Sequence, residues 1–120
     1  MGLFTRKKAQ LIFDTEAVID LTRDSYLIGR PANEKEEDEY DKVGKAGVKI
    51  VGNKIVIDAA HPTFSRIQGQ LTWNKEKGTY IYKNLSNRGI ININGKQVNG
   101  FHEFKSNDRV DLGNRHFIYI

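Results

Sequence analysis

The chain has 120 residues, which is enough for one domain with a hydrophobic core but not for two domains of ordinary size. It contains no cysteine, so disulfides, thiolate metal ligands and a cysteine nucleophile are excluded, and we expect a reducing, cytoplasmic location. The net charge of +4 favours anionic partners, and no apolar run reaches the length of a transmembrane helix, so we expect no membrane partner.

Short segments rich in β-branched and aromatic residues recur along the chain, separated by Gly, Asn and Asp, and no long stretch has helical periodicity. In chain order, the expected strands cover residues 9–14, 17–22, 26–29, 48–51, 54–58, 66–73, 79–85, 90–94, 109–113 and 116–120. Gly beside Asn in "VGNK", "NGKQ" and "LGNR" favours tight hairpin turns. The pattern is typical of a β-sandwich, and we expect a single all-β domain over residues 1–120.

Residues 31–47 interrupt this pattern with a polar stretch that has too little apolar surface to offset the entropy of ordering it. Three lysines against six acidic residues give the stretch a charge of −3, so with a total of +4 the rest of the chain carries +7. We expect a flexible, charged insertion. Either it is only a solvated loop, or it is an acidic flap that competes with anionic ligands for a basic face.

The strand expected at residues 66–73 shows strict alternation of side chains. Its odd-numbered residues, from Ile67 to Trp73, should face the core, and its even-numbered residues, beginning with Gln68, should face away from it. The last expected strand runs to Ile120, so it must pair with another strand to stay ordered. Removing that strand should unfold the domain.

Three short segments at expected strand ends supply cations and small hydrogen-bonding side chains. They contain Arg30, then Ser65 with Arg66, then Asn87 with Arg88. In a β-sandwich the loops at one end of the sheets converge, so we expect these side chains to lie together. Guanidinium groups bind phosphate oxygens in bidentate geometry and keep their charge, while hydroxyl and amide protons bond the remaining oxygens. The combination indicates a site for a phosphate dianion.

Four stretches of the sequence resemble the forkhead-associated (FHA) domain in order, spacing and turn chemistry. They are "IGR" at residues 28–30, "NKIVIDAAHPTFSRIQGQL" at 53–71, "NLSNRGIININGKQV" at 84–98 and "FKSNDRVDLGNRHFIYI" at 104–120. The resemblance covers nearly the whole chain. It implies a β-sandwich of about eleven strands that binds phosphothreonine peptides through the loops at one end.

By matched position, the resemblance implies a role for each of the polar residues in the three segments. Arg30 would be a phosphate ligand, Ser65 the hydroxyl that bonds a phosphate oxygen, and Arg66 a second cation. Asn87 would offer its amide to the phosphate. Arg88 stands where the family holds the main chain of the bound peptide.

The sequence departs from the family pattern at several positions in these loops. Gln68 replaces the His that braces the binding loops, and Gln can still form hydrogen bonds. Asn87 and Arg88 replace a Thr-Asn pair, and Arg88 can donate but not accept. Ile90 replaces a small polar residue, and one extra residue precedes Asn94. An alternative interpretation is therefore a degenerate scaffold that docks a partner on a sheet face without phosphate.

Enzymatic and metal-binding functions have little support in the sequence. His61, His102 and His116 follow no metal-ligand spacing. Ser65 lacks the Gly-x-Ser-x-Gly elbow of a hydrolase nucleophile. We expect no enzyme, no metal site and no cofactor.

Nucleic-acid binding is the strongest rival of a different class. A basic β-domain with Trp73, Tyr80 and Tyr82 could stack bases beside cations, although Trp73 is expected on the core face and the lysines are dispersed. We therefore interpret the chain as a non-enzymatic module that binds phosphothreonine peptides. Its expected partner is a phosphothreonine-containing protein, either a Ser/Thr kinase or a kinase substrate.

Overall fold

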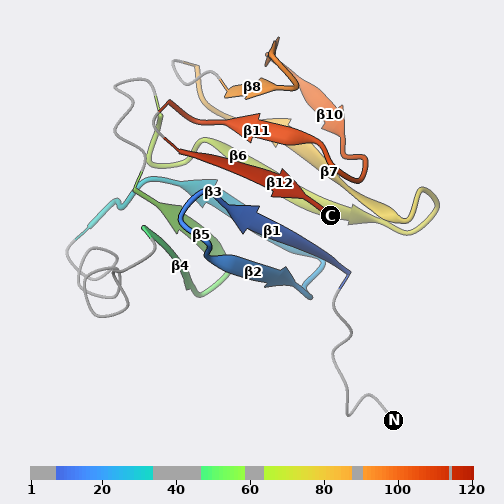
Figure 1. Ribbon diagram of the computed structural model, residues 1–120, viewed down its shortest axis with the longest axis horizontal. Coiled ribbons are helices and arrows are strands. Elements are labelled where there is room, and N and C mark those ends of the chain that lie inside the picture. Colours follow the sequence, from blue (N-terminus) through green and yellow to red (C-terminus); the bar gives the residue numbers. More distant parts are fainter. Residues whose placement is uncertain (1–7, 34–46, 59–63, 88–90, 114) are drawn as a thin grey trace, which may run out of the picture.

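Two six-stranded β-sheets pack face to face in this chain (Figure 1). The computed structural model describes residues 8–33, 47–58, 64–87, 91–113 and 115–120, and these contain no helix. The expected all-β sandwich is therefore confirmed. Most of the charged insertion predicted from the sequence lies outside the described residues.

The front sheet in Figure 1 consists, in spatial order, of β2 (Val18–Leu21), β1 (Ala9–Phe13), β12 (His116–Tyr119), β11 (Arg109–Asp111), β8 (Ile91–Ile93) and β9 (Lys96–Val98). The back sheet consists of β10 (Phe101–Glu103), β7 (Thr79–Asn84), β6 (Gly69–Asn74), β3 (Ser25–Gly29), β5 (Lys54–Ile57) and β4 (Val48–Val51). Neighbouring strands are antiparallel except β3 and β5, which run parallel.

Every strand expected from the sequence is present, with ends that differ by up to three residues. Two short strands, β9 and β10, go beyond that prediction. Each has only three residues, and neither shows buried residues alternating with exposed ones. Pairing with β8 and with β7 holds them in place, so tertiary contact rather than local pattern makes them strands.

The alternation predicted for residues 66–73 is correct only in its second half. Strand β6 begins at Gly69, with Leu71 buried and Trp73 packed against the core. The prediction is wrong for Ile67, which is 50% exposed, and for Gln68, which is fully buried. These two residues lie in the loop before the strand, where the backbone turns and the period of two does not apply.

The core lies between the inner faces of the two sheets. Leu11 and Phe117 from the front sheet are buried in the same cluster as Tyr26 and Leu71 from the back sheet. Burying a large apolar side chain completely contributes about 1.5–3 kcal/mol, so this cluster is the main source of stability. Strand β12, which ends at Tyr119, is part of it and pairs with both β1 and β11.

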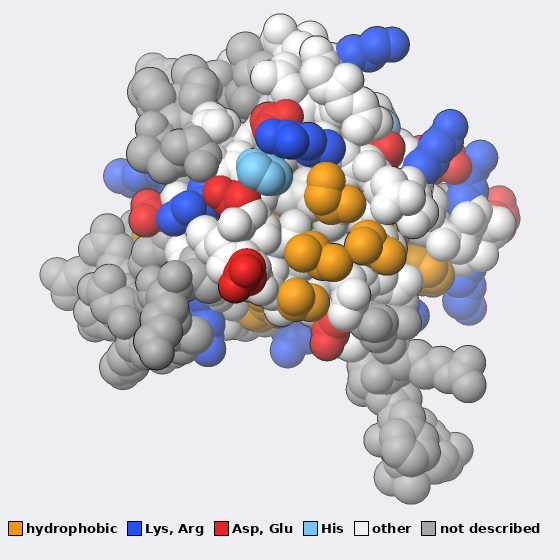
Figure 2. Space-filling view, viewed as in Figure 1, with side chains coloured by type: hydrophobic (Ala, Val, Ile, Leu, Met, Phe, Trp, Pro, Cys, Tyr) orange, Lys and Arg blue, Asp and Glu red, His pale blue; other side chains and the backbone are white. Residues whose placement is uncertain are grey.

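The outer face of the front sheet carries apolar side chains, which gather near its centre in Figure 2. Val18 and Ile120 on this sheet are 50% and 46% exposed. Lysines and arginines are scattered around the rim of this face rather than clustered (Figure 2). No helix in the described part of the chain is long and apolar enough to cross a membrane.

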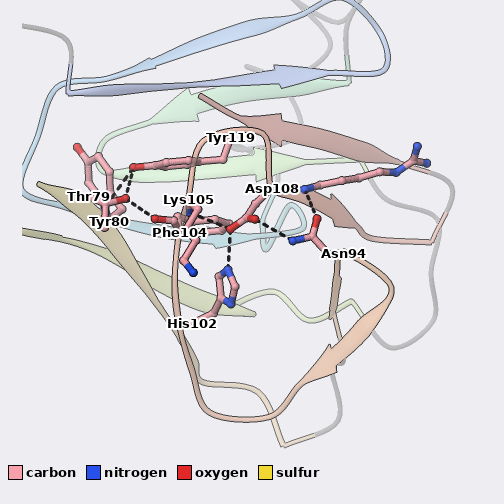
Figure 3. Close-up of polar contacts among 9 residues, drawn as sticks. Thr79, Tyr80, Asn94, His102, Phe104, Lys105, Asp108 and Tyr119 are labelled. Carbon is pink, nitrogen blue, oxygen red and sulfur yellow. Dashed lines mark hydrogen bonds and ion pairs between the residues drawn. The ribbon is translucent and has the colours of Figure 1, made fainter. Parts of the chain in front are cut away.

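A buried carboxylate fixes the edge of the back sheet (Figure 3). Asp108 is only 7% exposed, and its side chain accepts hydrogen bonds from the backbone N–H of Lys105 and the amide of Asn94, both at 2.8 Å. Its other contact is Nε2 of His102 on β10, at 2.9 Å. We call these four residues the carboxylate brace. It ties β10 to the turns that precede β9 and β11.

The hydrogen bonds of this brace determine the ionisation of Asp108. Burial alone would raise the pKa of the Asp108 carboxyl, but hydrogen bonds from His102, the Lys105 N–H and Asn94 outweigh it. The pKa is therefore lower than usual, and the carboxylate stays charged at neutral pH.

Candidate functional site

Three loops meet at the end of the back sheet where β3, β5 and β7 finish and β6 starts. The backbone N–H of Arg30 donates to the carbonyl of Ser65 over 3.1 Å, which joins the loop after β3 to the loop before β6. The hydroxyl oxygens of Ser65 and Ser86 lie 2.5 Å apart, which joins the second loop to the loop after β7. The structure thus brings the three sequence segments together.

Gln68 holds two of these loops from inside the protein. Its side-chain oxygen accepts a hydrogen bond from the Ser65 N–H over 3.0 Å, and its amide donates to the side-chain oxygen of Asn84 over 2.9 Å. Its backbone carbonyl accepts from the N–H groups of Leu85 and Ser86, at 3.0 and 3.2 Å. A fully buried amide with both ends bonded is stable where it is and positions both loops.

Two further side chains complete this arrangement. The Tyr82 hydroxyl donates to the side-chain oxygen of Asn84 over 2.9 Å, and the Asn84 amide donates to the carbonyl of Ser86 over 2.9 Å. Burial raises the pKa of Tyr82, so its hydroxyl stays neutral and remains a donor. We call Gln68, Tyr82 and Asn84 the amide brace. It contains no side chain that is charged at neutral pH.

Two glycines allow the backbone to pass closely at this end of the sheet. A Cβ atom on Gly29 would lie 1.9 Å from the carbonyl oxygen of Arg66. A Cβ atom on Gly69 would lie 2.3 Å from the ring of Tyr82. Both distances are shorter than any real contact, so a side chain at position 29 would displace the loop that carries Ser65 and Arg66, and one at position 69 would displace the ring of Tyr82.

The described residues predicted for the site lie at its surface. Ser65 is half-buried, whereas Arg30, Arg66 and Asn87 are exposed. Within the part of the chain that the structure describes, the two guanidinium groups form no ion pair or hydrogen bond. Arg88 lies outside the described residues.

This arrangement can supply several donors to one anion. The two arginines stay charged at any relevant pH, and the hydroxyls of Ser65 and Ser86 are held together beside them. No group of three or more His, Asp or Glu side chains among the described residues could hold a metal ion. The chemistry available here is therefore anion binding through charged and neutral donors.

Sequence reasoning missed two residues of this site, Ser86 and Asn84, and predicted the wrong orientation for a third, Gln68. Ser86 follows Leu85 in an ordinary turn sequence and gave no signal of its own. Asn84 is the last residue of a strand, and the alternation of residues along a strand does not predict which hydrogen bonds a side chain forms. Gln68 was expected to form hydrogen bonds, but alternation placed it on the outer face, whereas it points inward.

Two of the three aromatic side chains of the nucleic-acid interpretation are not available at the surface. Tyr80 and Tyr82 are both fully buried, and Trp73 packs edge-on against Tyr80 at 5.2 Å between ring centroids. Base stacking needs an exposed ring face, so Tyr80 and Tyr82 cannot provide it.

Comparison with known proteins identifies the family and agrees with the fold. The family model for the FHA domain matches residues 26–113, which include Arg30, Ser65, Arg66 and Asn87. A search of curated proteins finds no match to this chain.

Several solved protein structures have the same fold. The yeast Pml1 splicing factor superposes with a TM-score of 0.67 at 19% identity, over 99% of this chain and 84% of that chain. The FhaA FHA domain, solved in complex with the intracellular domain of Rv3910, superposes with a TM-score of 0.62 at 15% identity. The match covers 93% of this chain and 99% of that chain.

A third similar structure, that of Mycobacterium tuberculosis EmbR in complex with a low-affinity phosphopeptide, gives a TM-score of 0.62 at 17% identity. The superposition covers 92% of this chain but only 24% of the EmbR chain. At these identities the superpositions show a shared fold, and the family match covers most of the chain. The chain therefore belongs to the FHA domain family.

Proposed function

We propose that the three loops bind a phosphothreonine side chain in a partner protein, without catalysis. The observation that carries the proposal is the pair of hydroxyls on Ser65 and Ser86, fixed by the amide brace beside the backbone of Arg30 and Arg66. A phosphate dianion needs several donors and benefits from fixed cations, and this end of the molecule offers both. Because the loops are held in advance, little entropy is lost on binding.

The hydroxyl pair favours donation to an outside anion. Either hydroxyl can be the donor in the contact between Ser65 and Ser86, and when Ser86 donates, the Ser65 hydroxyl keeps a proton that it can donate to an anion. Accepting one hydrogen bond polarises that hydroxyl and strengthens the bond that it donates. A phosphate oxygen is the acceptor that we assign to it.

Arg30 and Arg66 then supply charge, and Asn87 supplies an amide donor from the third loop. Arg88 is proposed to contact the main chain of the bound peptide, from sequence position alone. The partner that we propose is a Ser/Thr kinase or a substrate of one, because such proteins carry phosphothreonine. The EmbR complex supports the choice of a phosphopeptide as ligand class.

The test is fluorescence-polarisation binding of the full chain to a degenerate phosphothreonine peptide library and to its unphosphorylated copy. We expect binding only to the phosphorylated library. Arg30→Ala should lose about 1.5–3 kcal/mol of binding free energy, the range for hydrogen bonds to charged groups. Arg109→Ala is the matched control, since Arg109 is exposed on the front sheet and pairs there with Asp111.

Two results would contradict the proposal. Equal binding of the two libraries would favour a degenerate scaffold that docks its partner without phosphate. Equal loss in Arg30→Ala and Arg109→Ala would mean that net charge, rather than the loops, attracts the peptide. A steep, sequence-tolerant salt dependence with single-stranded nucleic acid would support the rival class.

A further inference from the structure

A groove runs over the outer face of the back sheet, away from the core. Its cavity volume is about 250 Å³. It is lined by Gln70 and Thr72 of β6, Ile81 and Lys83 of β7, and Phe101 of β10, among others. In β6 and β7 the sequence neighbours of these residues are buried or packed against the core, so these side chains face outward, and Phe101 is itself exposed.

Phe101 forms the apolar wall of this groove. Its side chain is 72% exposed, more than any other large hydrophobic residue among those described. The ammonium of Lys83 lies 5.7 Å from the centre of the Phe101 ring, and Lys83 forms no ion pair within the described residues. The wall therefore combines an apolar ring with an unneutralised cation. A ligand with an apolar and an acidic group would complement both.

The wall is held rigidly although β10 is a short edge strand. His102, next to Phe101, contacts the buried Asp108 of the carboxylate brace at 2.9 Å (Figure 3). The strand also pairs with β7, where Phe101 lies opposite Lys83. A fixed wall keeps its shape in the absence of a ligand, which lowers the entropic cost of docking.

The groove begins directly beside the loops of the candidate site. Asn84 of the amide brace donates its backbone N–H to the carbonyl of Gly100, the residue before Phe101, over 2.9 Å. The side chain of Asn84 donates to the carbonyl of Ser86, which contacts Ser65. The next pair along β6 and β7 is Gln70 with Lys83, and both line the groove. One chain of contacts thus connects the ligand loops to the groove.

We propose that the groove binds the residues that flank the phosphothreonine in the same peptide. An aliphatic or aromatic side chain would pack on Phe101 and Ile81, and an acidic residue would pair with Lys83. Three to five peptide residues span about 10–17 Å when extended, so a peptide anchored at the loops can continue past Asn84 and Gly100 toward Phe101. This inference rests on the proposed function, because the phosphate places the peptide at the loops.

The test compares two oriented libraries with a fixed central phosphothreonine, one with two degenerate positions on each side and one with six. We expect the long library to select aliphatic or aromatic residues at a position three to five residues from the phosphothreonine. Binding should tighten about fivefold over the short library, as partial burial of one large apolar side chain allows. Phe101→Ala should abolish the selection and the gain, and leave binding of the short library unchanged.

Val18→Ala is the matched control, because Val18 is an exposed apolar residue on the outer face of the other sheet. It should keep both the selection and the gain. The groove assignment is wrong if the short library binds but the long library shows no selection. It is also wrong if the Phe101→Ala variant still selects the same residues. In both cases the phosphothreonine site stands. If neither library binds folded protein, the proposed function itself fails. Self-association of the chain that Phe101→Ala removes, without any peptide selection, would instead assign the groove to a second copy.

Discussion

Two hydrogen-bonded braces hold loops and turns of this sandwich, and they are built from different chemistry. The amide brace centres on Gln68, a neutral side chain that is fully buried. The carboxylate brace centres on Asp108, a charged side chain that accepts from a backbone N–H, an amide and an imidazole. Both fix loops, but only the second depends on ionisation. The ligand loops are therefore held by the part of the molecule that is insensitive to pH.

Truncating the charged brace should have the largest effect. Asp108→Ala removes the acceptor of three hydrogen bonds and leaves the Lys105 N–H without a partner, so the free energy of unfolding should fall by about 3–4 kcal/mol. Urea denaturation measures it. Asp111→Ala, which removes a surface carboxylate paired with Arg109, is the control and should cost less than about 1 kcal/mol. Similar losses in both variants would refute the special role of Asp108.

Disrupting the amide brace should reduce stability less than Asp108→Ala does, but it should weaken phosphopeptide binding more. Gln68→Leu leaves the Ser65 N–H without its side-chain partner and removes one of the two hydrogen bonds that the Asn84 side-chain oxygen accepts, so the free energy of unfolding should fall by about 2–3 kcal/mol. Phosphopeptide binding by the folded variant should weaken because Ser65 is no longer fixed. Gln68→His, which restores hydrogen-bonding nitrogens, should recover part of both. A variant that loses stability but keeps its affinity would show that the amide brace stabilises the fold without contributing to phosphopeptide binding.

The two braces should also respond differently to acid. The pKa of Asp108 is lower in the folded chain than in the unfolded chain, so its stabilising contribution is present above the unfolded pKa of about 3.9 and is lost as pH falls through the folded value. Wild type should therefore lose stability between about pH 5 and pH 2 more steeply than Asp108→Asn. Urea midpoints measured across this range provide the check. Parallel curves would show that Asp108 does not contribute to acid sensitivity.

The smallest effect is expected at the hydroxyl pair. Ser86→Ala should weaken phosphothreonine-peptide binding by about 0.5–1.5 kcal/mol, the net value of one neutral hydrogen bond. The unfolding midpoint should change little. Ser106→Ala, in the exposed turn before Asp108, is the control for removal of a serine hydroxyl. An unchanged affinity would restrict Ser86 to a structural contact with the neighbouring loop.

Much of the fold could be predicted because the sequence of the longer strands alternates between residues that face the core and residues that face solvent. Strands β1 and β12 alternate buried and partly exposed residues along their length, as a strand with one core face must. β10 could not be found in this way, because its three residues are a Phe at the surface, a His and a Glu. Its position depends on contacts with β7 and Asp108, which lie far along the chain or in a following turn.

The candidate site was predictable in part. The side chains that face solvent, Arg30, Ser65, Arg66 and Asn87, carry recognisable chemistry and were identified from the sequence as phosphate ligands, an assignment that remains to be tested. The supporting shell was not predictable in detail, because the inward turn of Gln68 depends on a loop conformation that no local pattern encodes.

The pairing of β1 with β12 has a consequence for the way in which the domain is made. Leu11 lies opposite Tyr119, so the first strand of the sandwich meets its partner only across more than a hundred residues of chain. Such non-local pairing makes folding slow, because a large loop must close before the contacts form. During synthesis, the hairpin of β1 and β2 must wait until the ribosome has released the final strand. Until then the edge of β1 that pairs with β12 has unpaired backbone groups, which makes it prone to pairing with other chains.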